Sequence, residues 1–578
     1  MIPPNLKNLS SLSQSELLQI LGQNSVVVLV GAGISCWEPT KLPTGQDFTS
    51  VVNNSIFRDP IHPFINQNDW NKLEELLRDV PFELLMERCP SHDKIRSILA
   101  NLFFSRKPNP IHDTLSQLVK SGLIHSIITT NYDLSLDEAL TGSLLKKVVQ
   151  ESDLPVSRAR LYFKIHGCAG TPNSMVFSLK HESAMPEWKQ GLLEELIENK
   201  VLLIIGYSGF DFEVCPEIAR ISVKSIVWNF FSQNDYERSP GFNHLKNTNI
   251  NKTVLLGDML TIFSLLGHPI RPQRYLNSQS NISSLLQNSF LKDELLLWRS
   301  RILNTMGNSR LALLSIDGLQ PDLSTNNKVV LEYAQALFHN GKYLSAFNEF
   351  IRAVKLSSCP YEKLHLELDA CDSLRCFGSY RRAHSMLNKI KKEIDLLPTS
   401  DIDLKSRVLL KELLMFYEIY KIFRKTRLFF LARILRDKSA WLIEQGAPLS
   451  LESGKWLDFQ QYRFWCERFN LDASILANHN GYPPLPTKKG YKHLGYQVAL
   501  LMEICDRAKQ GHSTSNEIDE GLELAKYLGS HPSCWKIAQI SRKSFPAQRR
   551  RWKQIYDNYL RKCEYSFPAR VQFSLLGT

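Results

Sequence analysis

VVVLVGAGIS, residues Val26 to Ser35, decides the fold of the first half of this chain. Five consecutive apolar residues form a run of strand length, and two glycines, Gly31 and Gly33, follow it directly. Glycines let a backbone approach a pyrophosphate closely, and the amides at the start of a following helix attract anions. The full six-residue dinucleotide fingerprint is absent, because Cys36 stands where its third glycine would be. The segment therefore predicts a strand that ends in an anion-binding turn.

Short apolar runs recur downstream and alternate with segments of helical period. This pattern is typical of a parallel sheet with helices on both faces. Residues from about 50 to 120 are expected to be a helical insertion between the first two strands. We therefore expect a Rossmann-like α/β domain over residues 1–270, with strands at 26–30, 124–129, 161–165, 201–205, 225–228 and 253–256.

The second half of the chain has a helical pattern almost to its end. A polar stretch at 271–290, which we interpret as a linker, precedes apolar residues at helical spacing over 291–578. A Gly-x-Tyr-x-x-Ala pattern occurs at Gly341 and again one expected helix pair later at Gly378. This pattern resembles tetratricopeptide repeats, in which small residues let paired helices approach. We expect an all-α helical-repeat domain, with a less regular bundle as the alternative.

Charge and composition narrow the class of protein. Residues 1–270 carry 24 Lys and Arg against 28 Asp and Glu, whereas residues 271–578 carry 46 against 30. The basic half is expected to have solvated Lys- and Arg-rich helix faces, or to bind nucleic acid or an acidic protein. The longest apolar runs are far shorter than the roughly 20 residues that cross a bilayer. The N-terminus lacks a secretory pattern and the 11 cysteines form no Cys-x-x-Cys pair. We expect a cytoplasmic protein without a membrane partner or structural metal.

Polar motifs follow three further expected strands. Residues 127–133 are IITTNYD, residues 164–168 are KIHGC, and residues 201–211 are VLLIIGYSGFD. Ligands bind at the carboxyl ends of the strands in open α/β sheets. These segments and the first glycine turn are therefore expected to share one crevice.

GAGIS, TTNYD, IHG and GYSGFD, in this order, resemble the NAD-binding domain of the sirtuin family over residues from about 20 to 265. Sirtuin deacylases also carry a zinc module with two Cys-x-x-Cys pairs and a GIPDFR stretch, and the segment from Cys36 to Phe48 has no matching arginine. A zinc-free sirtuin-like domain joined to a long helical part is similar to the bacterial defence-associated sirtuins, which hydrolyse NAD during phage infection. The resemblance implies NAD as the substrate, no metal, and control by assembly or by a bound partner, with a homo-oligomer expected.

Asn131 and His166 are the expected catalytic residues. His166 suits a general base because an unperturbed imidazole has a pKa near 6.5. The Asn131 amide can donate to and accept from the ribose and a water molecule. The resemblance implies that Asp133 contacts the nicotinamide carboxamide. It also implies pyrophosphate contacts at Gly31, Ala32, Gly33, Ser35 and Thr130, and adenosine-side contacts at Gly206, Ser208, Asp211 and Asn229, although Asp211 would equally suit a helix cap.

The leading interpretation is an NAD glycohydrolase that releases nicotinamide and ADP-ribose as a regulated effector of abortive anti-phage defence. The basic helical half would bind the trigger, which is a phage protein, a nucleic acid or a companion defence protein. One alternative is an NAD-dependent protein deacylase or ADP-ribosyltransferase, which the missing zinc module disfavours. Another is a noncatalytic sensor scaffold that binds NAD or ADP-ribose, which the presence of both Asn131 and His166 disfavours.

Overall fold

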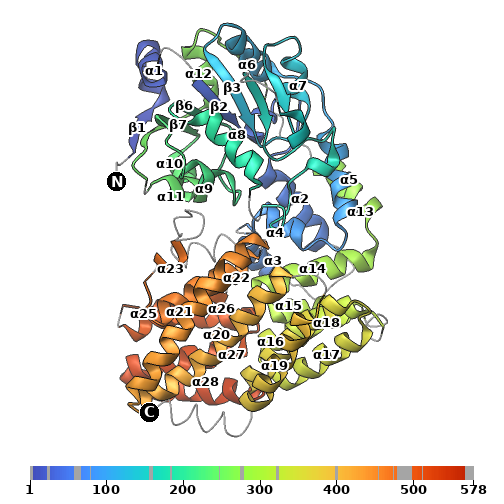
Figure 1. Cartoon of the computed structure of the whole chain (residues 1–578), viewed down its shortest axis with the longest axis vertical. Coiled ribbons are helices and arrows are strands. Elements are labelled where there is room, and N and C mark those ends of the chain that lie inside the picture. The colour runs from blue at the N-terminus through green and yellow to red at the C-terminus, as the bar shows by residue number, and fades with distance from the viewer. Residues whose placement is uncertain are drawn as a thin grey trace. The chain divides into compact units, whose positions relative to one another are not determined.

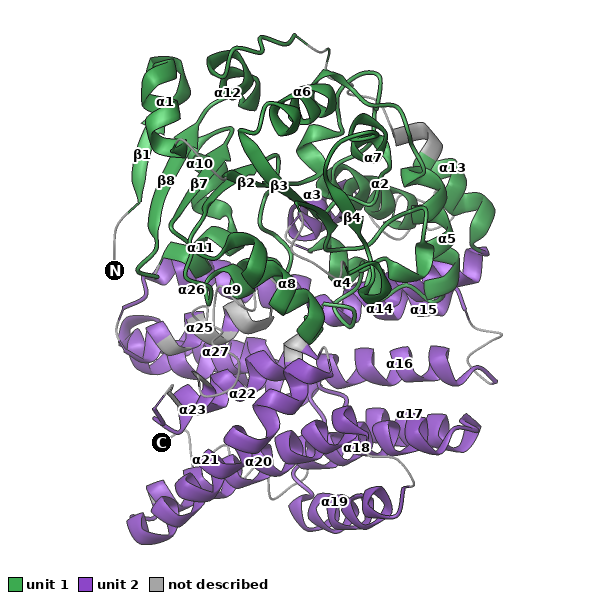
Figure 2. Cartoon of the chain, turned by 45° about the horizontal axis from the view of Figure 1, so that its top comes forward, with its two compact units in different colours: residues 1–58, 81–290, 480–485 green, residues 59–80, 291–479, 486–578 purple. Residues whose placement is uncertain are grey.

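The chain divides into two compact units (Figure 2). Unit 1 comprises residues 1–58, 81–290 and 480–485, and unit 2 comprises residues 59–80, 291–479 and 486–578. The computed structural model describes residues 4–22, 26–57, 67–78, 80–154, 160–182, 185–246, 248–271, 273, 279–319, 325–397, 401–453, 455–472, 474–477, 498–510 and 512–565.

Unit 1 is built on a parallel sheet of eight described strands (Figure 1). Their order is β1-β8-β7-β6-β2-β3-β5-β4, and each neighbouring pair is parallel. The strands are β1 (Asn5–Asn8), β2 (Val26–Val30), β3 (Ile124–Thr129), β4 (Lys146–Val148), β5 (Leu161–Lys164), β6 (Val201–Ile205), β7 (Ser225–Phe230) and β8 (Asn251–Leu256). The six expected strands and the α/β fold class are confirmed. The two edge strands, β1 and β4, were not predicted.

Strand β2 lies inside the sheet and is buried on both faces. Val27 and Leu29 belong to one apolar cluster, which includes Leu192 of α8 and Ile218 of α9. The alternate residues of β2 belong to a second cluster, which contains residues of α1, α6 and α12. A strand covered on both faces needs an unbroken apolar run, which explains VVVLV. Because all the strands are parallel, their carboxyl ends lie along one edge of the sheet.

Helices α2 to α6 lie between β2 and β3, and residues 58–66 and 79 of this segment lie outside the described residues. The described helices of unit 1 are α1 (Gln14–Leu21), α2 (Gly45–Phe57), α4 (Phe82–Glu87), α5 (His92–Phe103), α6 (Pro110–Lys120), α7 (Ser135–Ala139), α8 (Glu187–Ile197), α9 (Val214–Ile218), α10 (Gln233–Arg238), α11 (Pro240–Lys246), α12 (Met259–Leu265) and α13 (Gln279–Ser289). Helix α13 occupies much of the expected linker, and its Ser283 hydroxyl lies 3.1 Å from that of Ser55 on α2. Residues 272 and 274–278 of that linker lie outside the described residues.

Unit 2 is helical throughout its described residues. Its helices are α3 (Gln67–Leu77), α14 (Lys292–Met306), α15 (Ser309–Asp317), α16 (Asn327–Asn340), α17 (Tyr343–Leu356), α18 (Pro360–Phe377), α19 (Tyr380–Asp395), α20 (Ile402–Lys425), α21 (Phe429–Glu452), α22 (Trp456–Arg468), α23 (Ser474–Ala477), α25 (Val498–Lys509), α26 (Ser515–Tyr527), α27 (His531–Ser544) and α28 (Arg549–Lys562). Gly341 and Gly378 end α16 and α18 at φ of 90° and 96°, values that favour glycine. The expected helix pairs are therefore confirmed at both glycines.

Helix α3 belongs to unit 2, although its sequence lies between two strands of unit 1. The Asp69 carboxylate is 2.8 Å from the guanidinium of Arg310 on α15. The Tyr527 hydroxyl donates to the Asp69 carbonyl at 2.9 Å. The expected helical insertion is thus divided between the two units. No helix in the described part of the chain combines the length and apolar character needed to cross a membrane.

Candidate active site

The glycine turn after β2 is packed tightly against the turn after β6. A Cβ atom on Gly31 would lie 2.6 Å from the Cα atom of Tyr207, and one on Gly33 would lie 2.9 Å from the Cα atom of Gly206. The Gly33 amide donates to the Gly206 carbonyl at 2.9 Å, and the Gly31 amide donates to the Ile205 carbonyl at 3.2 Å. Both glycines are therefore required for the contact between the two loops, and both amides are already bonded within the chain.

Ser35 joins the glycine turn to the TTNYD segment. Its hydroxyl donates to Oδ2 of Asp133 at 2.9 Å and accepts from Nδ2 of Asn131 at 3.2 Å. The same Asn131 amide lies 3.2 Å from the Gly31 carbonyl. The other oxygen of Asp133 accepts from the backbone amide of Ser135 at 2.9 Å. The expected residues Gly31, Ser35, Asn131 and Asp133 therefore form one hydrogen-bonded group.

The side-chain oxygen of Asn131 is buried and has no hydrogen-bond partner in the described part of the chain. A buried polar atom without a partner is rare in folded proteins. The amide nitrogen of Asn131 is held at two acceptors, so the direction of this oxygen is fixed. The arrangement leaves one oriented acceptor for a ligand hydroxyl or a water molecule.

His112, which the sequence analysis did not select, holds Ser35 from the other side. The backbone amide of Asn109 donates to Nδ1 of His112 at 3.1 Å. A neutral imidazole then carries its proton on Nε2, which lies 3.3 Å from the Ser35 hydroxyl. Burial lowers the pKa of His112, which favours this neutral form. His112 therefore donates to the Ser35 hydroxyl, and the Ser35 hydroxyl donates to Asp133.

His166 follows β5, the strand next to β3, and is almost fully buried. Its Nε2 atom lies 3.3 Å from Oε1 of Glu213, which is completely buried. Burial lowers the pKa of His166, but Glu213 and Asp211 outweigh this effect, and the pKa is raised. Gly167 follows at φ of 87°, and a Cβ atom there would lie 2.1 Å from the Ser174 carbonyl oxygen. The glycine of the IHG motif is therefore needed for the turn that carries the histidine.

Four buried carboxyl groups interact electrostatically around Tyr132 and His166. They are Glu83 of α4, Glu182, Asp211 and Glu213. Burial raises the pKa of Glu83 to about 8 and raises that of Glu182 well above its ordinary range. At neutral pH Glu83 is therefore expected to be mostly protonated. Because these groups are buried, any negative charge among them acts in a region of low dielectric constant.

The residues expected to contact the adenosine side of NAD each have different hydrogen-bond partners within the chain. Asp211 accepts from the Tyr207 hydroxyl and, at 2.9 Å, from the backbone amide of Val214, the first residue of α9. Asn229 donates to the carbonyls of Leu255 and Gly257, so its amide group ties β7 to the end of β8. Ser208 is exposed. Its carbonyl accepts from the Ser239 hydroxyl at 2.8 Å.

The remaining expected contacts lie in the loops after β2 and β3. Ala32 begins a short 3-10 turn that ends at Ile34. The Thr130 backbone amide donates to the Val30 carbonyl at 3.2 Å, and the Thr130 side chain is partly exposed. Both residues are therefore at the carboxyl ends of the central strands.

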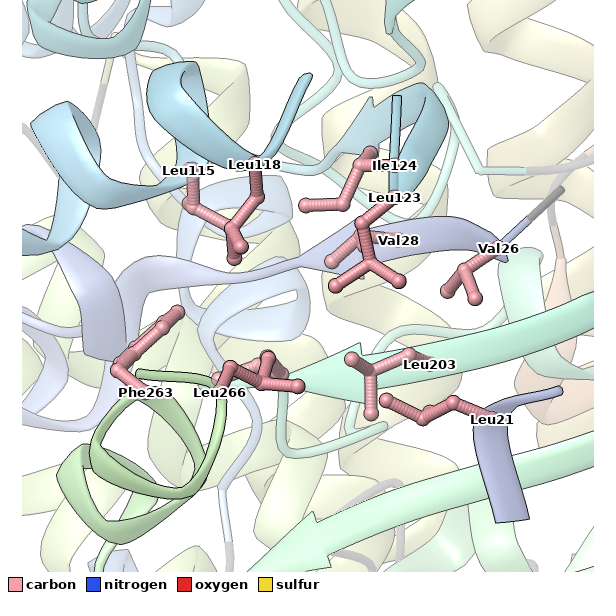
Figure 3. A pocket seen from close by; sticks show the side chains of 11 residues that line it. Leu21, Val26, Val28, Leu115, Leu118, Leu123, Ile124, Leu203, Phe263 and Leu266 are labelled. Atoms are coloured by element: carbon pink, nitrogen blue, oxygen red, sulfur yellow. The ribbon is translucent and has the colours of Figure 1, made fainter. Parts of the chain in front are cut away.

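A cavity in unit 1 is lined by apolar side chains (Figure 3). Eleven apolar side chains line it, including Val26 and Val28 of β2, Leu115 and Leu118 of α6, and Phe263 of α12. These β2 side chains belong to the face that contains α1, α6 and α12. The cavity is a gap in the packed core and offers no polar group to a nucleotide.

One family of known proteins matches part of this domain. Residues 125–222 match the SIR2-like domain family. No curated protein matches the chain. A solved STAND ATPase with a tetratricopeptide repeat sensor, PH0952 from Pyrococcus horikoshii, is similar at 11% identity, with 95% of this chain and 88% of that chain covered and a TM-score of 0.20. Because that TM-score is low, the fold assignment rests on the sheet and on the SIR2-like match, which is associated with NAD-using enzymes.

Sequence patterns identified the loops at the strand ends but missed several residues that lie beside them. His112, Lys164 and Glu213 were not selected. Lys164 is fully buried and reaches Asp137 at 2.9 Å, and Glu213 lies two residues after the GYSGFD motif. Lys164 and Glu213 could have been selected as charged residues that lie within or near a motif at a strand end. His112 carried a weaker signal, an Asn-Pro helix start at residues 109–110.

Proposed function

We propose that the chain is an NAD glycohydrolase that cleaves NAD to nicotinamide and ADP-ribose. The observation that carries the proposal is the placement of Asn131 and His166 after two neighbouring parallel strands, with His166 beside the buried Glu213. An oriented acceptor and a base of raised pKa are the two groups that activation of a water molecule requires. The SIR2-like match over residues 125–222 supports NAD as the substrate.

The reaction exchanges one bond to the ribose for another. The bond between C1′ of the ribose and the nicotinamide nitrogen breaks, and its electron pair leaves with nicotinamide. The oxygen of water forms the new bond to C1′, and its proton passes to His166. Asn131 Oδ1 orients the water or a ribose hydroxyl through a hydrogen bond. Because the leaving group is neutral, no general acid is needed.

The buried carboxyl groups suit the charge that develops in this reaction. Positive charge builds on the ribose as the glycosidic bond breaks, and fixed negative charge near it lowers the barrier. Asp211 and Glu213 are buried in the same region as His166 and act on it electrostatically.

We further propose that the activity is regulated and serves anti-phage defence. An unregulated NADase would deplete its own cell, so the helical unit would sense the trigger or hold the enzyme inactive. The excess of Lys and Arg in residues 271–578 favours an acidic protein or a nucleic acid as the trigger. Control by assembly into a homo-oligomer belongs to the same proposal.

The direct test measures NAD loss and nicotinamide release by the purified chain, with and without a lysate of phage-infected cells. The wild type is compared with Asn131→Ala and His166→Ala. Loss of NAD that requires both residues and increases with the lysate supports a regulated NADase. Intact NAD in every reaction, with NAD binding measured by calorimetry, favours the sensor scaffold. Turnover that requires an acyl-lysine peptide favours the deacylase.

A further inference from the structure

The hairpin of α20 and α21 in unit 2 has an apolar end. The two helices pack against each other, and three residues, Thr426 to Leu428, join them (Figure 1). Leu428, Phe429 and Phe430 are 48%, 61% and 76% exposed. We call residues 419–438 the hairpin tip.

Exposed apolar side chains are concentrated at and just beyond this tip. Among the described residues, eight of the eighteen exposed large hydrophobic side chains lie between Ile419 and Trp441. Scattered exposed apolar residues need no explanation, but a contiguous group marks a surface that something covers. The hairpin tip is therefore a candidate interaction surface.

The same residues are strongly basic. Arg424, Arg427, Arg433 and Lys438 are exposed. Asp437 is the only acidic residue in the sequence from 419 to 438. The surface that covers the tip must therefore combine an apolar interior with negative charge at its edge. Two copies of the tip would bring like charges together, which disfavours a symmetric contact between them.

The distribution of the exposed residues around the helix distinguishes a bilayer from a protein groove. Leu428 to Leu431 are four consecutive residues, and all are exposed. Leu428 is the N-cap of α21, and Phe429, Phe430 and Leu431 are its first three residues. At 3.6 residues per turn these three side chains are spread over roughly 200° of the helix circumference. A groove on a partner protein covers one stripe, at positions such as i, i+3 and i+4. Lipid surrounds an inserted tip and can cover all four.

We propose that the hairpin tip inserts into the interface of an anionic membrane. Leu428, Phe429 and Phe430 lie among the upper parts of the acyl chains, and the exposed arginines contact the headgroup phosphates. Insertion of a hairpin tip into the interface does not require an apolar run long enough to span the membrane. The expectation of no membrane partner was based only on the absence of such runs. The proposal does not depend on the NADase activity.

The test is flotation of the full chain with vesicles of phosphatidylcholine, with or without about one third phosphatidylglycerol. Binding is expected only to the anionic vesicles. Phe430→Ser should weaken it about tenfold, since the variant removes a large buried apolar side chain from the bound state. Phe231→Ser is the matched control, because Phe231 is 72% exposed and lies in unit 1. Replacing both Arg427 and Arg433 by Gln should weaken binding by about tenfold or more.

Three results would overturn the proposal. The first is equal binding to neutral and anionic vesicles. The second is an equal effect of Phe430→Ser and Phe231→Ser. The third is no vesicle binding together with a change in molar mass by light scattering in Phe430→Ser, which would assign the tip to a contact between copies of the chain. Circular dichroism of each variant checks that unit 2 remains folded.

Discussion

Glu213 Oε1 lies 3.3 Å from Nε2 of His166, and the Glu213 carboxylate has no hydrogen bond to any group in the described part of the chain. Glu213 is completely buried. A buried carboxylate is costly unless a cation compensates it, and His166 is in position to do so when protonated. The pair therefore favours the protonated imidazole, the form that His166 takes after it accepts a proton from water.

Glu213→Gln is expected to shift the pH dependence of NAD cleavage. Burial lowers the pKa of His166 and Glu213 helps to raise it, so removal of this carboxylate lowers the pKa. In this variant Asp211 and Lys189 still act electrostatically on His166, and Glu83 acts on it only where Glu83 is ionised. The base must be neutral to act, so the acidic limb of kcat/KM moves to lower pH. The rate at neutral pH falls by about tenfold or more, since the imidazole becomes a weaker base.

Glu217→Gln is the matched control for this change. Glu217 lies one turn further along α9, and its carboxylate pairs with Arg220 at 3.0 Å. Its substitution should leave the acidic limb of the profile in place. Identical profiles for Glu213→Gln and the wild type would show that Glu213 does not act on His166.

Ser35→Ala is expected to reduce activity through Asn131 and Asp133. The change removes the donor to Oδ2 of Asp133 and one of the two acceptors that hold the Asn131 amide. A buried group left without a partner costs about 1–3 kcal/mol, and loss of orientation at Asn131 should lower kcat about tenfold. In the control, Ser135→Ala, the backbone amide still donates to Asp133. Equal kcat values in the two variants would contradict this role of Ser35.

Gly33→Ala is expected to separate the turns after β2 and β6. The new Cβ atom would lie 2.9 Å from the Cα atom of Gly206, which is backbone and cannot rotate away. Overpacking of this kind costs about 1–3 kcal/mol, so the Tm of unit 1 and the NADase activity should both fall. Gly191→Ala in α8 meets no atom within 4 Å and should stabilise the helix by about 1 kcal/mol. Calorimetry of both variants measures the contrast.

The apolar pattern of the sequence was sufficient to locate the covered strands. VVVLV and VLLII form β2 and β6, which are buried throughout. The edge strands gave no such pattern, because Asn5–Asn8 and Lys146–Val148 are polar and mostly exposed. Hydrogen bonding to a neighbouring strand makes these segments strands, and the sequence does not record that pairing.

The order of the motifs along the chain also predicted that Ser35, Asn131 and Asp133 lie close together, and hydrogen bonds join them in the structure. Parallel strands place their carboxyl ends at one edge, so the order of motifs becomes proximity in space. Glu213 and His112 come from helix starts, and their partners depend on how α9 and α6 pack on the sheet. The local sequence pattern does not indicate how these helices pack on the sheet.

Glu83→Gln is expected to change how stability depends on pH. Burial raises the pKa of Glu83 from its ordinary value of 4.5 to about 8. Between these values the folded state holds a proton that the unfolded state has released. The stabilisation that Glu83 contributes to the folded state is complete when the pH is below its unfolded-state pKa. This stabilisation is lost as the pH rises through its folded-state pKa, with a slope of up to about 1.4 kcal/mol per pH unit. Glutamine does not titrate, so the Tm of Glu83→Gln should fall less between these two pH values than that of the wild type.

Glu138→Gln, at an exposed position on α7, should keep the wild-type slope. Parallel Tm curves for Glu83→Gln and the wild type would mean that Glu83 is ionised at neutral pH in the folded protein.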